Sequence, residues 1–236
     1  HQEHLQIENW YEEGWFTKHR VRLLGTSSVY RVPTRRINGT SLDLVVKHNR
    51  VGEDVPLNTH TLQEFMSAEF NSPWEEFALV MEMGDKHFGQ MLQWIKVQRP
   101  LAIYVPPQRM QAWQSGRSRA KINRIQARHP GVDLDILKQY KLVYEWIRGK
   151  NLVEIFEHIK VEMPDLVHHL TKMQKKALDD LTVKGYLMAD MKPEHVIIEE
   201  HDCDRIEQLG GNGDAGAAAK QVDLLYHLLE VGKYSV

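Results

Sequence analysis

The sequence predicts an α+β protein built from two lobes. Its first half consists mainly of short apolar segments between turn signals, which predict strands, together with one long helix. Its second half consists mainly of helical patterns around a short apolar strand, Val196–Ile198. Strands and helices gathered in different parts of a chain are typical of α+β folds. The 236 residues, 42% of them hydrophobic, are enough to bury one large core or two small ones.

Three segments near the N-terminus predict successive antiparallel strands. Leu23–Leu24 and Val29–Val32 are apolar runs on either side of Gly25–Ser28. Leu42–Lys47 is rich in β-branched residues, which favour strands. It follows Asn38–Gly39, a strong signal for a tight turn between two strands.

The remaining elements follow in chain order. Ser72 and Pro73, followed by two glutamates, predict the start of a helix. Leu101–Val105 and Tyr140–Ile147 are apolar and aromatic runs that predict two more strands. Apolar residues at helical spacing over 166–181 predict a long helix, and Gly185 is expected to end it.

A basic insertion, residues 108–129, separates two of these strands. It contains no acidic residue, and we expect a solvated loop or an exposed helix that is dispensable for folding. Its cationic residues are Arg109, Arg117, Arg119, Lys121, Arg124 and Arg128.

Composition narrows the classes of protein to consider. A single cysteine, Cys203, excludes an internal disulfide, and no basic start is followed by an apolar run. We therefore expect a cytoplasmic protein. No segment approaches the ~18 consecutive apolar residues of a membrane span. The formal charge of −2 gives no general reason to expect nucleic acid as a partner.

The segment from Gly185 to Ile198 contains an Asp-Met-Lys-Pro run between a helix and a strand. It resembles the catalytic loop of the protein kinase-like superfamily, H-R-D-x-K-x-x-N followed by an apolar strand. The resemblance implies that Asp190 orients the attacking hydroxyl and that Lys192 steadies the transferring phosphate. Met188 stands at the first histidine of that motif. His195 stands at its metal-binding asparagine, where it could instead bond a phosphate or brace the loop.

The same resemblance extends upstream. Gly25-x-Ser27-x-x-Tyr30-x-Val32 is in register with the family's glycine-rich loop, and implies that Gly25, Ser27 and Val32 contact nucleotide. Lys47 corresponds to the lysine of the family's V-A-I-K strand. In this family a helix carboxylate holds that lysine toward the phosphates. Glu76 is the preferred partner, with Glu64, Glu69 and Glu75 as alternatives.

The segment 143–152 resembles the kinase hinge, where a strand leads into an extended linker and a short helix. The resemblance implies that backbone groups of Glu145, Trp146 and Ile147 bond the adenine edge and that Tyr144 lies at the inner end of the pocket. Its apolar walls would be Val32, Val45 and Ile197.

These motifs together predict an atypical bacterial-type kinase or a pseudokinase, with ATP and Mg²⁺ bound between the lobes. The N-lobe would span 1–143, the hinge 144–150 and a partial helical C-lobe 151–236. No D-F-G occurs, so we expect the second metal ligand beyond Val236, with Asp204 and Asp223 as internal alternatives.

Three functions remain open at this point. The first is transfer of phosphate to a hydroxyl of a protein or a small molecule. The second is a pseudokinase that binds nucleotide or docks partners without catalysis. The third is a nucleic-acid-binding or regulatory module that uses the basic insertion, and it requires the cationic side chains to form one patch.

Overall fold

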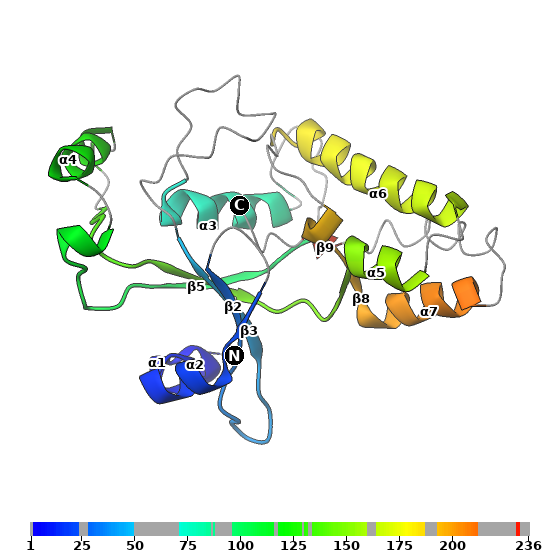
Figure 1. The fold of residues 1–236 in the computed structure, drawn as a ribbon, viewed down its shortest axis with the longest axis horizontal. Coiled ribbons are helices and arrows are strands. Elements are labelled where there is room, and N and C mark those ends of the chain that lie inside the picture. The colour runs from blue at the N-terminus through cyan, green and yellow to red at the C-terminus, as the bar shows by residue number, and fades with distance from the viewer. Residues whose placement is uncertain are drawn as a thin grey trace. The chain divides into compact units, whose positions relative to one another are not determined.

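The computed structural model describes residues 2–23, 28–49, 71–85, 87, 96–115, 118–128, 130–131, 134–159, 164–186, 193–211 and 230–231 (Figure 1). The chain divides into two compact units. Unit 1 comprises His1–Leu79, Pro100–Trp146 and Tyr234–Val236, and unit 2 comprises Val80–Arg99 and Ile147–Lys233. The third passage between the units, after Trp146, falls within the segment predicted as a hinge.

Unit 1 contains a five-stranded sheet in which every neighbouring pair of strands is antiparallel. The predicted α+β class is therefore confirmed. The order across the sheet is β1 (Val21–Arg22), β2 (Val29–Pro33), β3 (Asp43–His48), β6 (Lys141–Glu145) and β5 (Pro100–Tyr104).

The strands of unit 1 lie close to where the sequence predicts them. Asn38 and Gly39 both have positive φ, 51° and 80°, and form the turn between β2 and β3. Such a pair of positive φ angles matches the twist of a hairpin. The first strand lies slightly earlier than expected, because β1 ends at Arg22 and Leu23 only donates its N–H to the carbonyl of Val29.

Short N-terminal helices cover one face of this sheet, and the sequence analysis did not predict them. They are η1 (Glu3–Leu5), α1 (Ile7–Trp10) and α2 (Glu13–His19), drawn in blue in Figure 1. Trp10 and Phe16 from these helices are buried. They form one apolar cluster with Val32, Leu44, Val46 and Val143 of the sheet. Burial of two aromatic rings is worth several kcal/mol, roughly 1.5–3 for each large side chain.

Helix α3 (Pro73–Gly84) begins where the sequence predicts. The hydroxyl of Ser72 accepts the N–H of Glu75 at 3.2 Å, and the Glu75 carboxylate accepts the N–H of Ser72 at 2.8 Å. This reciprocal capping box satisfies two backbone donors that the helix leaves unpaired. It fixes the first turn of α3, which carries Glu76.

The basic insertion contains a helix, one of the two forms expected for it, but this helix is only partly exposed. It contains η3 (Ala112–Ser115) and α4 (Arg119–Arg128). Ile122 and Ile125 of α4 are buried against Ile136. One face of α4 is therefore a packing face, and only the rest of the helix is exposed as predicted. The many cationic residues of the segment hide the apolar spacing of these two isoleucines in the sequence.

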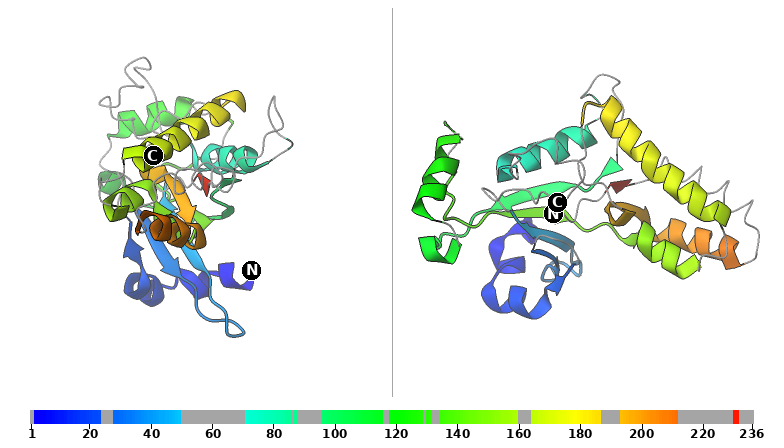
Figure 2. Two further views of the ribbon diagram at one scale, coloured as in Figure 1. Left: turned by 90° about the vertical axis from the view of Figure 1, so that its right-hand side faces the viewer. Right: turned by 45° about the horizontal axis from the view of Figure 1, so that its top comes forward.

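The described residues of unit 2 include a four-stranded sheet and the helices α5 (Leu152–Ile159), α6 (Pro164–Val183) and α7 (Glu200–Gly211) (Figure 2). The strand order is β4 (Lys96–Val97), β9 (Glu230–Val231), β8 (Val196–Glu199) and β7 (Gly149–Asn151). Strands β4 and β9 are parallel and the other pairs are antiparallel. Strand β8 and helix α6 were predicted, whereas β7, β9 and α7 were not.

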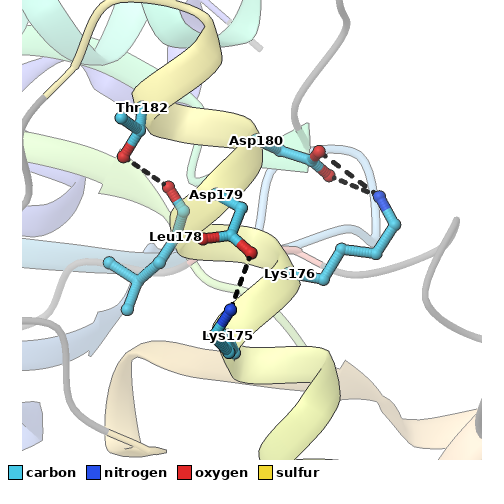
Figure 3. Close-up of polar contacts among 6 residues, drawn as sticks. All are labelled: Lys175, Lys176, Leu178, Asp179, Asp180 and Thr182. Carbon is cyan, nitrogen blue, oxygen red and sulfur yellow. Dashed lines mark hydrogen bonds and ion pairs between the residues drawn. The ribbon is translucent and has the colours of Figure 1, made fainter.

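Helix α6 ends as the sequence predicts. Gly185 has φ of +98°, and the N–H of Tyr186 bonds the carbonyl of Leu181 at 2.9 Å. This is the six-to-one bond of a left-handed helix end, which favours glycine. Two ion pairs four residues apart, Lys175–Asp179 and Lys176–Asp180, line the outside of α6 (Figure 3). Exposed pairs of this kind contribute little, about 0.3–0.5 kcal/mol each.

Among the helices that the structure describes, none combines the length and apolar character needed to span a membrane.

Candidate functional site

The candidate site of unit 1 is a buried ion pair between Lys47 of β3 and Glu76 of α3. The ammonium nitrogen of Lys47 lies 2.5 Å from Oε1 of Glu76. Lys47 is only 2% exposed and Glu76 only 7%. The structure thus contains the contact that the sequence predicted for Lys47. A role in nucleotide binding stays a prediction.

Two further side chains hold the Glu76 carboxylate. The hydroxyl of Tyr144 donates to Oε1 at 3.2 Å, and the amide of Asn49 donates to Oε2 at 3.1 Å. Burial raises the pKa of Tyr144 well above 10, and the negative charge and hydrogen bond of Glu76 raise it further. The phenol therefore stays protonated and acts as a donor. With Lys47, both carboxylate oxygens have polar donors, and the carboxylate is fixed in one position.

The geometry follows from strand alternation and from the helix cap. Lys47 pairs with Leu142 across β3 and β6, and Val45 pairs with Tyr144. Residues two apart on a strand share a face, so Val45, Lys47 and Tyr144 all point to the same side of the sheet. Glu75 is occupied by the cap of α3, which leaves Glu76 to face Lys47. The alternatives Glu64 and Glu69 lie outside the described residues.

Val32 is not where the sequence analysis expected it. It pairs with Leu44 and packs against Trp10, on the face of the sheet opposite to Lys47. Val32 and Val45, both predicted as walls of the pocket, therefore lie on opposite faces of the sheet. Val29 lies on the same face as Lys47, because it is fully buried and pairs directly with Lys47. A shift of one residue in strand register explains the difference, since it moves every side chain to the other face.

One backbone N–H of the predicted hinge already donates a hydrogen bond within unit 1. The N–H of Trp146 donates to the carbonyl of Asp43 at 3.0 Å and continues the ladder in which Glu145 pairs with Leu44. The Trp146 N–H is thus an unsuitable donor for an adenine edge. Ile147 and Ile197 are both buried within unit 2.

The predicted catalytic loop falls mostly outside the described residues. Asp190 and Lys192, like Gly25 and Ser27, belong to these undescribed segments. His195 lies in η4 (Pro193–His195), directly before β8, and is 1% exposed. No group of three or more His, Cys, Asp or Glu side chains able to hold a metal occurs in the described part of the chain. Magnesium prefers oxygen ligands, and the imidazole of His195 does not supply one.

A second buried lysine lies on the opposite face of the unit 1 sheet and was missed. Lys141 Nζ lies 3.0 Å from Nε2 of His48 and 3.2 Å from Oε1 of Gln139, and 5.2 Å from the ring centre of Tyr11. Burial, with a smaller effect of Arg20, lowers the pKa of Lys141 to about 8. Burial lowers the pKa of His48 to about 4, helped by the charge of Lys141. His48 is therefore neutral at pH 7 and accepts a hydrogen bond from Lys141.

Within unit 2, another lysine caps the C-terminal end of α3. Lys184 donates to the carbonyl oxygens of Met83, at 2.9 Å, and Asp85. The hydroxyl of Tyr186 donates to the carboxylate of Glu82 at 3.2 Å. A cation at the C-terminal end of a helix stabilises the carbonyls that have no partner inside the helix. A lysine directly before the glycine that ends α6 was the only sequence signal for this contact.

Comparison with known proteins gives little beyond these observations. No protein-family model and no curated protein matches the sequence. The solved structures that match include a MAP kinase from Leishmania major, with 12% identity and a TM-score of 0.34. The match covers 78% of this chain and 42% of that kinase, so the chain spans less than half of its length. A TM-score this low does not establish a shared fold.

Proposed function

We propose that the protein binds ATP and transfers its γ-phosphoryl group to a hydroxyl acceptor. The observation that carries this proposal is the buried ion pair of Lys47 and Glu76, in which a lysine at the end of a strand is held by a helix carboxylate. The motif resemblance around Asp190 adds the chemistry of transfer.

A purely structural role explains this ion pair poorly. Taking two charges out of water costs several kcal/mol for each ion, and apolar residues of similar volume often stabilise a protein as well or better. Glu76 nevertheless has three donors, from Lys47, Tyr144 and Asn49. Such a network fixes an ammonium group in advance, which is what electrostatic stabilisation of a phosphate requires.

Four residues would have separate roles in this reaction. Lys47 would bind phosphate oxygens, and Glu76 would keep the ammonium in place. Asp190 would accept the proton of the acceptor hydroxyl. The hydroxyl oxygen would form a bond to the γ-phosphorus while the bond from that phosphorus to ADP breaks. Lys192 would steady the transferred group.

The alternative is a pseudokinase that binds nucleotide or a partner without catalysis. The burial of His195 favours it, because an imidazole that is 1% exposed is suited to bracing the loop. The position of Met188, in place of the motif's histidine, points the same way.

Transfer of labelled γ-phosphate separates the two functions. With varied hydroxyl acceptors and Mg²⁺ or Mn²⁺ present, the kinase proposal predicts turnover that falls by ~10²-fold or more in Asp190→Asn, with ATP binding retained. Absence of any turnover or autophosphorylation that depends on Asp190 would leave the pseudokinase. In an ATP-binding titration with and without Mg²⁺, His195→Asn should strengthen metal-dependent binding only if residue 195 is a metal ligand.

A further inference from the structure

The basic insertion carries a net positive charge, unlike the rest of the chain. Residues 108–129 contain six Arg and Lys residues and no Asp or Glu, although the whole chain has a formal charge of −2. The remainder of the protein is therefore net acidic. A strongly anionic partner would be attracted to this segment and repelled elsewhere.

The structure shows which part of the insertion is exposed. Ile122 and Ile125 direct one face of α4 against Ile136, and Arg119 and Arg124 are exposed. Within the described part of the chain, neither arginine has a carboxylate partner. Arg109, by contrast, is paired with Asp135 at 2.7 Å. Arg119 and Arg124 are thus two cations whose charge no described residue neutralises in an ion pair.

An exposed tryptophan lies in the same segment. Trp113 of η3 is 79% exposed, the most exposed of the large hydrophobic side chains that the structure describes. The N–H of Met110, three residues earlier, bonds the carbonyl of Leu137 at 2.7 Å, and Leu137 packs against the cluster of α4 and Ile136. Three residues span at most ~11 Å, so η3 is held close to α4.

We propose that η3 and α4 form a docking surface for single-stranded nucleic acid. Trp113 would stack on an unpaired base, and Arg119 and Arg124 would contact the adjacent phosphates. Stacking on an exposed aromatic ring combined with cations that follow the backbone is how proteins bind single strands without sequence preference. This inference does not depend on the proposed phosphotransferase activity.

Other anionic partners fit the surface less well. An amphipathic helix binds a membrane through its apolar face, but that face of α4 is occupied by Ile136. A duplex keeps its bases stacked and offers no ring face to Trp113 except at its ends. An acidic peptide would use the two arginines but has no need of an exposed indole.

Fluorescence anisotropy with a labelled oligonucleotide of about 12 nucleotides tests the proposal, because single-strand sites span ~4–16 nucleotides. Single-stranded RNA, single-stranded DNA, a duplex of the same length and anionic vesicles are compared at several salt concentrations. We expect both single strands to bind more tightly than the duplex. Trp113→Ala should weaken binding by about tenfold, which is typical of losing one stacked base.

The arginines are tested by the salt dependence of binding. Arg119→Gln/Arg124→Gln should reduce the slope of log affinity against log salt by about 1.4, since each phosphate contact on a single strand contributes ~0.7. Lys18→Gln/Lys172→Gln is the matched control, because both of these lysines are exposed and the change in net charge is the same. The control should bind almost as well as the wild type.

Several results would overturn the proposal. It fails if no single strand binds at low salt, or if the duplex binds as tightly as the single strands and Trp113→Ala has no effect. It also fails if the control variant loses as much affinity as the arginine variant. Binding to vesicles alone would identify a membrane surface instead.

Discussion

Removing one partner of the Lys47–Glu76 ion pair should destabilise the protein strongly, because the other charge stays buried without its counter-ion. Lys47→Met leaves the Glu76 carboxylate buried with only Tyr144 and Asn49 as donors. Removing one partner of a buried pair typically costs ~3–5 kcal/mol. Because two donors remain, we expect Lys47→Met to lower the unfolding free energy by about 3 kcal/mol, the lower limit of this range.

The double variant gives the interaction energy between the two side chains, apart from the effect of each substitution on its other contacts. Glu76→Gln leaves the ammonium facing an amide oxygen and should cost about 2 kcal/mol, the scale of a hydrogen bond to a charged group. Lys47→Met/Glu76→Gln should cost about 3 kcal/mol and not the sum of the two, because it leaves no unpaired charge. The resulting coupling energy is about 2 kcal/mol, within the range for residues in direct contact.

Urea unfolding followed by circular dichroism gives these free energies by linear extrapolation. The matched control is the exposed pair Lys175–Asp179 of α6, at 3.4 Å, shown in Figure 3. Its coupling, measured with Lys175→Met and Asp179→Asn, should be about 0.5 kcal/mol or less. A coupling for Lys47–Glu76 as small as that of the control would refute the buried ion pair.

Three other variants test the packing. The pKa of His48 is lowered from 6.5 to about 4, so between these values only the unfolded chain binds this proton. The unfolding free energy should therefore decrease as the pH is lowered from 6.5 to about 4. In His48→Gln this decrease should be smaller by up to about 3 kcal/mol. Gly149→Ala would place Cβ 1.9 Å from the carbonyl oxygen of Ile198, so its melting temperature should drop sharply, unlike that of Gly14→Ala, whose Cβ has no neighbour within 4 Å. Ile125→Asp should cost about 3 kcal/mol by calorimetry; unchanged unfolding would support the prediction that the insertion is dispensable for folding.

The parts of the fold that were predictable have strong local signals. The start of α3 was predictable because serine, proline and two glutamates favour a helix N-terminus in the unfolded chain as well. The end of α6 required a positive φ that Gly185 adopts without strain. The pairing of Lys47 with Glu76 was predicted from the resemblance to the kinase family and from the helical face that Glu76 shares with Leu79 and Val80. In the structure, the cap of α3 occupies the neighbouring Glu75.

The face of the sheet occupied by Val32 was not predictable from the turn. Ile37 opposes Thr40 at the turn, and continuing that register would pair Val32 with Val45. The observed pairs, Val32 with Leu44 and Pro33 with Asp43, are shifted by one residue. An irregularity between the turn and the strand thus decides which valine lies beside Lys47, and side-chain periodicity does not reveal it.

The N-terminal helices were missed for a different reason. Helix α1 has four residues and α2 has seven, too few for a helical period to stand out. Trp10 and Phe16 belong to different helices, and only the tertiary contact with the sheet unites them. Isolated helices of this length are unstable, so packing and not propensity forms them.

Calorimetric titration with ATP tests the central claim, that Lys47 belongs to a nucleotide site. The wild type should bind, and Lys47→Met, shown to be folded by circular dichroism, should bind at least about tenfold more weakly because it loses a charge-assisted bond to phosphate. Lys141→Met is the matched control, since it removes a lysine that is equally buried on the opposite face of the same sheet. It should bind ATP like the wild type. Absence of ATP binding by the wild type, or equal binding by Lys47→Met, would contradict the account.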